Sequence, residues 1–217
     1  MNHSNEIPRS AEVVVIGGGV IGLTVARALV QRGARDVLLI ERSSLGAEAS
    51  FAAGGMLAPQ TEANSRDDFF ELACQSRDLY PNFAVALREE TGIDVELDTT
   101  GTLYCAFTER DVDEIEKRYE WQTQAGLLVE KLTTSGAREL ERCIAESVLG
   151  ALRFPHDIQV ENRRLLNALV NSIDKLGVGI NTDTKVESLA IERGRIKGVQ
   201  TSRGFVSCRT AINAAGT

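Results

Sequence analysis

The sequence lacks the marks of several large classes of protein. It contains no apolar run approaching the roughly 20 residues that a membrane-spanning helix needs. Residues 1–10 are polar and lack the apolar centre of a secretory signal peptide, so we interpret them as a flexible N-terminus. These absences predict a cytoplasmic protein without a membrane span.

Residue types that bind metals and nucleic acids are also scarce or scattered. The 217 residues include two histidines and four cysteines, and the cysteines form no CxxC pair. This pattern predicts no metal site and four reduced thiols. The 24 basic residues are outnumbered by 31 acidic ones and form no basic stripe, which predicts no nucleic-acid partner. With 43% apolar residues, the chain has enough material for a buried core.

The clearest local pattern is a strand, a glycine turn, a helix and a second strand within thirty residues. Residues 13–16 and 37–40 are continuous aliphatic runs, typical of strands buried on both faces of a parallel sheet. The intervening helix ends near Gly33. Its apolar spacing predicts a buried face made of Ile21, Val25, Ala28 and Leu29.

The glycine turn has the pattern and the surroundings of a dinucleotide-binding site. Gly17 permits the tight turn, Gly19 lets the backbone approach a pyrophosphate, and Gly22 lets helix and strand pack closely. Glu41 ends the second strand, where its carboxylate would accept hydrogen bonds from ribose hydroxyls and repel the 2′-phosphate of NADP. The residues alone leave NAD and FAD open.

Patterns further along the chain predict a mixed α and β region. Residues 66–91 have helical spacing with a kink or break at Pro81, and we expect Phe69 and Phe70 in the core. Strands are expected at 101–107 and 148–154. Residues 108–111 form a capping-box pattern that opens a helix, and further helices begin near Ser135 and Asn162. An antiparallel meander over 185–209 precedes a final buried strand over 210–216.

Residues 49–57, ASFAAGGML, resemble the segment that the FAD-dependent D-amino-acid oxidase superfamily places beside the flavin ring. A flat ring lies against backbone only where Cβ atoms are few. Residues 66–70, 76–80 and 91–95 follow in the order and spacing of the glycine oxidases of thiamine biosynthesis. The resemblance covers residues 11–217 and favours FAD over NAD.

The resemblance implies an α/β fold, in which a Rossmann-like FAD-binding domain of the glutathione-reductase type carries an inserted, partial α+β substrate domain. We expect residues 11–80 and 155–217 in the FAD-binding domain and 81–154 in the substrate domain. No side chain of this chain is expected to be catalytic. The implied FAD contacts are Gly17, Gly19, Val20, Ile21 and Gly22 at the pyrophosphate, Glu41 and Arg42 at the ribose, Ala49 and Ser50 along the diphosphate, Gly54, Gly55 and Met56 at the ring, Val186 at the adenine, and Gly216 in a returning glycine turn.

Two of these residues have alternative interpretations, because Met56 would also suit a core position and Ser50 would also suit a helix N-cap. The implied reaction oxidises glycine or a small amine to an imine, which hydrolyses to glyoxylate or a 2-oxo acid and ammonia while O2 becomes H2O2. The product would feed thiazole formation for thiamine.

The implied partners are a small amino acid and O2, and homo-oligomers stay open. The family's carboxylate-binding arginine lies beyond Thr217, so we expect an N-terminal part of a longer oxidase, inactive by itself. Sarcosine or D-amino-acid oxidases or dehydrogenases, and a non-catalytic FAD-binding fragment, are the alternatives.

Overall fold

The computed structural model describes residues 6–216, which form two compact units. The first contains the chain up to Gly54, Val85–Val95 and the chain from Glu161, and the second contains Gly55–Ala84 and Glu96–Val160. These limits differ from the expected domain boundaries, which lie at 80/81 and 154/155. Strand β3 (Met56–Leu57) pairs with β7 (Ile158–Gln159), and this pairing places both strands in the second unit.

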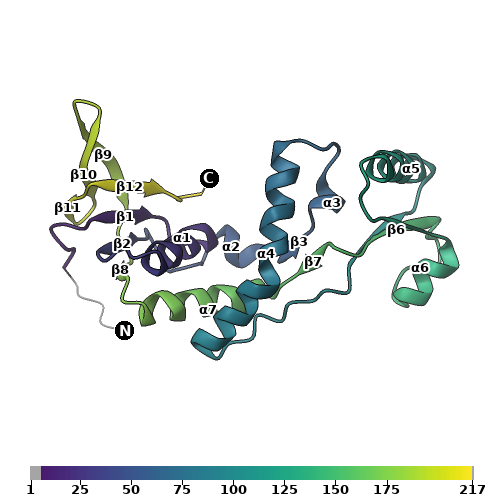
Figure 1. Ribbon diagram of the computed structural model, residues 1–217, viewed down its shortest axis with the longest axis horizontal. Helices are drawn as coiled ribbons and strands as arrows, with labels where there is room; N and C mark the ends of the chain where they lie inside the picture. Colours follow the sequence, from purple (N-terminus) through teal and green to yellow (C-terminus); the bar gives the residue numbers. More distant parts are fainter. Residues whose placement is uncertain (1–5, 217) are drawn as a thin grey trace. The chain divides into compact units, whose positions relative to one another are not determined.

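The first unit is built on a four-stranded parallel sheet in the order β12-β1-β2-β8 (Figure 1). Its central strands β1 (Val13–Ile16) and β2 (Val37–Ile40) pair in register from Val13 with Val37, and both are largely buried, as expected. Strand β8 (Gly179–Asn181) extends the sheet beyond β2, and β12 (Thr210–Asn213) extends it beyond β1. This confirms the α/β fold.

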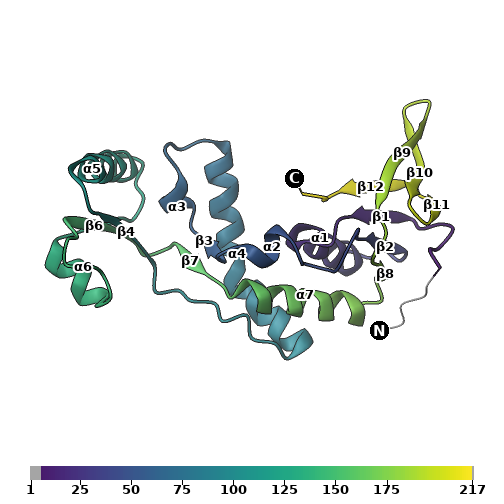
Figure 2. The ribbon, with the colours of Figure 1, turned by 180° about the vertical axis from the view of Figure 1, so that it is seen from behind.

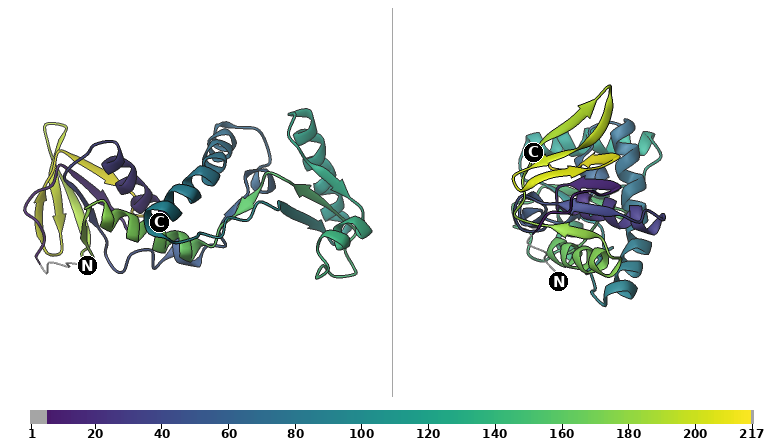
Figure 3. Two further views of the ribbon diagram at one scale, coloured as in Figure 1. Left: turned by 60° about the horizontal axis from the view of Figure 1, so that its bottom comes forward. Right: turned by 90° about the vertical axis from the view of Figure 1, so that its left-hand side faces the viewer.

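Two layers cover this sheet. Helices α1 (Val20–Gln31) and α7 (Asn162–Lys175) pack side by side, and α1 also contacts β1 and β2 (Figure 2). The predicted meander of β9 (Val186–Glu192), β10 (Arg195–Thr201) and β11 (Gly204–Ser207) is confirmed, and its β9–β10 hairpin projects past the sheet (Figure 3). The core between sheet and meander is formed by Ala11, Val14, Leu38, Ile40, Val199, Val206 and Cys208.

Three expectations about the first unit are wrong. The buried face of α1 consists of Gly22, Leu23, Ala26 and Arg27, whereas Ile21 is 64% exposed. Strand β12 is not buried, because among the described residues it pairs with β1 alone and lies at the sheet edge. Residues 1–5 of the expected flexible N-terminus lie outside the described residues, but Arg9 and Ser10 are tied to Ser207 by backbone pairing.

The second unit contains a smaller antiparallel sheet in the order β4-β6-β5. Its strands are β4 (Thr102–Ala106), β5 (Glu130–Leu132) and β6 (Gly150–Phe154), and helix α5 (Glu109–Gln124) packs on β4 and β6. The predicted capping box at Thr108 is confirmed at the start of α5. Three helices are short: α2 (Ala49–Ala52) in the first unit, and α3 (Pro59–Glu62) and α6 (Thr134–Leu140) in the second.

Helix α4 (Asp68–Thr91) continues through Pro81, so the expected break is absent. Proline removes one backbone N–H from the helix. Phe70 and Leu87 are buried on either side of Pro81, and their packing stabilises both halves of α4. No helix among residues 6–216 combines the length and the apolar character that crossing a bilayer requires.

An ion pair joins α1 to the last turns of α4 in the first unit. The Arg27 guanidinium, on the buried face of α1, donates from Nε to Glu90 Oε2 at 3.0 Å and to Ser172 Oγ at 3.1 Å. Ser172, on α7, donates to the same Glu90 oxygen at 2.7 Å. Partial burial raises the pKa of Glu90, but hydrogen bonds from Arg27 and Ser172 outweigh burial and hold the pKa below its usual value.

We expect Glu90→Gln to lower the free energy of unfolding at pH 7 by about 1–3 kcal/mol, since hydrogen bonds to a charged group are lost. A depressed folded-state pKa stabilises the protein above the unfolded-state pKa, and this stabilisation is lost as pH falls through the folded-state value. The difference from the parent should therefore stay constant near pH 7 and shrink as the pH falls below the ordinary glutamate pKa of 4.5 in urea unfolding. Glu89→Gln, at an exposed neighbour, is the matched control; an equal loss in both variants would contradict the prediction.

Candidate functional site

The glycine turn after β1 is closed by contacts that leave no room for side chains. Gly17 has a φ of +105°, and a Cβ there would lie 2.3 Å from the Ala214 carbonyl oxygen. A Cβ on Gly22 would lie 1.8 Å from the Gly17 carbonyl oxygen. Gly19 is less enclosed, because a Cβ there would meet Ser50 Oγ alone, although at a tight 3.1 Å. Two glycines are therefore needed for packing, and the third leaves a hollow beside the turn.

The N-terminus of α1 opens onto this hollow. Its N-cap residue, Gly19, has no side chain to accept a hydrogen bond, and the first N–H groups of any α-helix lack partners within the helix. Ser50 Oγ accepts the hydrogen bond of Val20 N–H at 3.0 Å. Ser50 thus caps α1 from a distant segment rather than its own helix α2, whose N-cap is Glu48. Such a helix end favours anions.

Glu41 ties the end of β2 to the glycine turn. Its Oε2 accepts the Gly18 N–H at 2.7 Å, and its Oε1 accepts the Ser43 N–H at 2.9 Å and the Ser43 hydroxyl at 3.3 Å. The backbone N–H of Thr184 donates to the Glu41 carbonyl at 2.9 Å, which brings the chain just before β9 to the same place. The carboxylate therefore has a structural task in addition to any ligand contact.

Arg42 turns to a different partner. Its Nε donates to Glu48 Oε1 at 2.9 Å, and a second contact joins its Nη2 to the other Glu48 oxygen. This pair is exposed, and the hydrogen bond from Arg42 lowers the pKa of Glu48. The pair holds Glu48 at the rim of the hollow, where both Glu41 and Glu48 are lining residues.

These groups enclose a small cleft of about 130 Å3. A water molecule occupies about 30 Å3 of the liquid, so the cleft suits a group of several atoms, such as a diphosphate. Of the predicted residues, it brings together Gly17, Gly19, Val20, Ile21, Glu41, Ala49, Ser50 and Gly216. It also contains residues that the prediction missed, namely Ser44, Gly46, Ala47, Glu48, Ala214 and Ala215.

The missed residues belong to segments next to predicted ones. Among them, the glycine at position 46 is a sequence feature that could have indicated a turn at the site. Its φ of +69° suits glycine, and a Cβ there would lie 3.1 Å from the Leu166 side chain. Asn162 at the start of α7 was also missed. Its Nδ2 donates to the carbonyls of Ser50 at 2.8 Å and Phe51 at 2.9 Å, and so holds α2 in place.

Six predicted residues do not line the cleft. In the first unit, Gly22 packs behind the turn, Arg42 pairs with Glu48, and a Cβ on Gly54 would meet nothing within 4 Å. Val186 begins β9, two residues after the contact of Thr184 with Glu41. Gly55 and Met56 belong to the second unit.

Met56 lines a separate cavity of about 590 Å3 within the second unit. Its side chain is 50% exposed, so the alternative interpretation as a core methionine is wrong. Phe69 lines the same cavity and is 76% exposed, which contradicts its expected core position. Phe70 is buried as expected and packs edge-on against Trp121, with ring centroids 5.9 Å apart.

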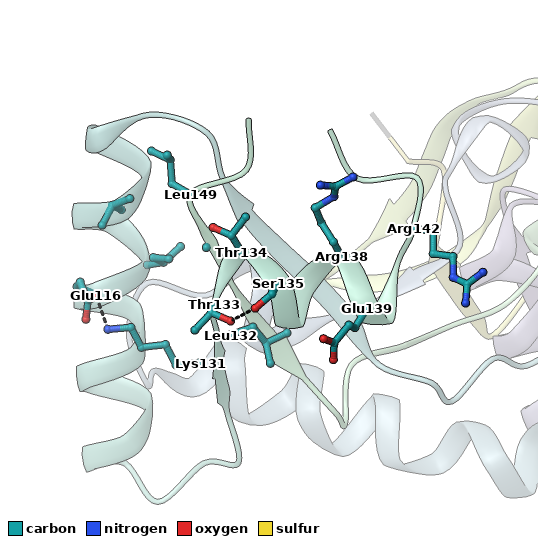
Figure 4. Close-up of a pocket in the computed structure, with 13 residues that line it drawn as sticks. Glu116, Lys131, Leu132, Thr133, Thr134, Ser135, Arg138, Glu139, Arg142 and Leu149 are labelled. Atoms are coloured by element: carbon teal, nitrogen blue, oxygen red, sulfur yellow. Dashed lines mark hydrogen bonds and ion pairs between the residues drawn. The ribbon is translucent and has the colours of Figure 1, made fainter. Parts of the chain in front are cut away.

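A larger hollow of about 1190 Å3 lies between α5, β5 and α6 in the second unit (Figure 4). None of the predicted cofactor residues lines it. Two of its cationic side chains have partners on the protein, since Lys131 pairs with Glu116 and Arg138 pairs with Glu146 at 3.3 Å. Thr133 and Ser135 hydrogen-bond to each other at 3.0 Å on one wall (Figure 4).

The chain is similar to known proteins over almost its whole length. The model of the DAO family, described as FAD dependent oxidoreductase, matches residues 12–217. The glycine oxidase of Geobacillus kaustophilus (strain HTA426) is 34% identical over 207 residues, which are 94% of this chain and 54% of that protein. The bifunctional protein ThiO/ThiG of Trichormus variabilis is 33% identical over 214 residues, 94% of this chain and 31% of that protein.

Solved structures agree with these relatives. The crystal structure of glycine oxidase from Bacillus cereus ATCC 14579 matches with a TM-score of 0.87 and 36% identity, covering 95% of this chain and 55% of the other. The chain thus spans about half the length of the glycine oxidases it matches.

We expect Gly22→Ala to lower the free energy of unfolding by about 3 kcal/mol or more, since a Cβ 1.8 Å from a backbone oxygen forces the turn apart. Gly136→Ala is the control, because its Cβ would make ordinary contacts at 3.5 Å within α6. Thermal and urea unfolding of both variants measure the effect. A Gly22→Ala protein as stable as the parent would show that the turn has a different conformation.

Proposed function

The chain belongs to the DAO family of FAD dependent oxidoreductases, and on that premise we propose that its first unit binds FAD non-covalently through the cleft at the start of α1. The observation that carries this proposal is the cleft lined by Gly19, next to a helix N-terminus and a strand-end carboxylate. Backbone N–H groups and the positive helix end suit a pyrophosphate. A carboxylate at the end of the second strand suits ribose hydroxyls.

The residues present fit the cofactor. The Glu41 carboxylate offers about four acceptor positions, and the three hydrogen bonds from Gly18 and Ser43 leave one for a ribose hydroxyl. The cleft residues Gly19, Val20 and Ser50 would hold the diphosphate. The family resemblance supports the remaining contacts, which are Gly17, Ile21, Gly22, Arg42, Ala49, Gly54, Gly55, Met56, Val186 and Gly216.

When bound, FAD supplies the redox chemistry by accepting a hydride from the substrate and passing electrons to O2. The chain's own residues then have a binding task. Glu41 and the α1 N-terminus fix the nucleotide, and Ser50 holds the first turn of α1 in its helical geometry. Because the cofactor carries the difficult step, no acid–base side chain is required among these residues.

For the substrate, we propose glycine or another small amine, with O2 as the second substrate and H2O2, ammonia and a 2-oxo acid as products. The glycine oxidases among the relatives support this assignment, and the ThiO/ThiG relative supports a supply of product to thiazole formation. A cytoplasmic location stays a prediction. The side chain that binds the substrate carboxylate is not assigned to any of these 217 residues.

We expect Gly19→Val to abolish FAD binding while the protein stays folded. Its side chain fills the hollow, and the one neighbour that has to shift is the Ser50 hydroxyl, 3.1 Å from the added Cβ. Glu41→Gln should weaken binding about tenfold to a hundredfold, the equivalent of roughly 1–3 kcal/mol. Flavin fluorescence titration measures both, with Glu89→Gln as the charge-matched control. Unchanged affinity in Gly19→Val, or a preference of the parent for NAD, would contradict the proposal.

We further expect the 217-residue chain loaded with FAD to produce no peroxide from glycine. We assign no side chain among the described residues to the substrate carboxylate, so we do not expect the α-carbon to be held against the ring. Positioning of this kind lowers the barrier by several kcal/mol. A peroxide assay at saturating glycine, sarcosine and D-alanine tests this, with the second half of a glycine oxidase relative added in a parallel sample. Steady turnover by the chain alone would place the substrate site within these residues.

A further inference from the structure

Helix α3 in the second unit is capped by a side chain from far along the sequence. Its own N-cap residue, Ala58, makes no side-chain hydrogen bond. Asp157, in the turn between β6 and β7, takes its place: Oδ1 accepts the Gln60 N–H at 3.2 Å, and Oδ2 accepts the Thr61 N–H at 2.7 Å and the Thr61 hydroxyl at 2.9 Å. Asp157 is completely buried, and the Arg77 guanidinium lies 3.4 Å from Oδ1.

The carbonyl end of the same segment is held by a cation. Arg118, on α5, is 6% exposed, and its Nη1 donates to the carbonyls of Thr61 at 2.7 Å and Ala63 at 2.6 Å. Its Nη2 donates to Asn64 Oδ1 at 3.1 Å, and the guanidinium lies 5.0 Å above the Tyr104 ring. A carboxylate therefore meets the N–H groups of this turn, and a guanidinium meets its carbonyls.

A third contact holds the middle of the segment. The Gln60 side chain donates to Gln122 Oε1 and to the Leu128 carbonyl, each at 3.0 Å, and Gln122 donates back to the Gln60 carbonyl at 2.8 Å. Both glutamines are buried. Replacing such a buried polar network by apolar side chains is often neutral or stabilising in proteins, so stability alone does not account for it.

The residues held by the network lie among residues that line the cavity. Gln60 and Thr61 are held by Asp157, Pro59 and Glu62 line the 590 Å3 cavity that also contains Met56, and Ala63 lines the cavity while its carbonyl is held by Arg118. Met56 and Leu57 are joined to Gln159 and Ile158 by the β3–β7 pairing, directly beside Asp157. Asp157 thus fixes the turn of α3, and the neighbouring strand β7 pairs with the strand that carries Met56.

We propose that Asp157 and Arg118 are positioning residues, which hold residues 56–63 in one conformation so that Met56 presents a fixed surface to the flavin ring and the cavity beside it keeps its shape. This inference rests on the proposed function through Met56, which we propose as a ring contact. The network itself touches neither cofactor nor substrate. Its effect is transmitted by the backbone of the clamped segment.

The first arm of the test needs no cofactor. In Asp157→Asn, the amide NH2 group faces one of the two backbone N–H donors and cannot accept its hydrogen bond. Arg118→Lys keeps the positive charge but loses the two guanidinium nitrogens that donate to Thr61, Ala63 and Asn64. We expect hydrogen exchange of residues 56–63 to become at least about tenfold faster in both variants, since tenfold corresponds to the loss of about 1.4 kcal/mol. Asp113→Asn, at an exposed position on α5, is the control and should exchange like the parent.

The second arm measures bound FAD. We expect Asp157→Asn to bind FAD within about threefold of the parent affinity, while the visible circular dichroism of the bound flavin changes. If Asp157→Asn melts below the working temperature, Thr61→Val removes only the hydroxyl contact and should shift both readouts in the same direction.

The outcomes separate the two proposals. A parent that binds no FAD overturns the proposed function and, with it, the role of Asp157 toward the ring. A parent that binds FAD, with variants whose exchange or flavin dichroism equals that of the parent, overturns the positioning role alone.

Discussion

The close approach of backbone to backbone at the glycine turn is the constraint on which the first unit depends. Gly17 lies against the Ala214 carbonyl at the end of β12, and Gly22 lies against the carbonyl of Gly17 itself. Only because these two positions lack a Cβ do the ends of β1 and β12 meet where α1 begins. The hollow beside Gly19 then exists as a by-product of this packing, and Glu41 and Ser50 complete its walls.

Polar side chains act over long sequence distances throughout both units. Ser50 caps a helix that begins thirty residues earlier, and Arg27 binds Glu90 and Ser172 on two other helices. Asp157 accepts a backbone N–H hydrogen bond from the single turn of α3, and Arg118 donates to a backbone carbonyl of the same turn. In each case a backbone or charged group is buried, and burial without a partner would cost free energy. These contacts therefore specify one arrangement of the segments more than they add stability.

The elements of this fold were largely predictable, because their signals are local. The aliphatic runs at 13–16 and 37–40, the capping box at Thr108 and the alternation in the meander each depend on neighbours within a few residues. Burial was less predictable. Ile21 and Phe69 are apolar and sit at helical spacing, yet both are exposed and line cavities. Which face of a helix is buried depends on what packs against it, and local spacing carries no information about that partner.

By itself the sequence determined the α/β class, the glycine turn with its strand-end acid, and membership of an FAD-dependent family. Only the tertiary structure decided how the candidate site is held. It gave Glu41 the hydrogen bonds of Gly18 and Ser43, turned Arg42 toward Glu48, and placed Asp157 at the start of α3. The physical reason is that a glycine pattern expresses a backbone requirement of its own residues, whereas a hydrogen-bond partner a hundred residues away is chosen by packing.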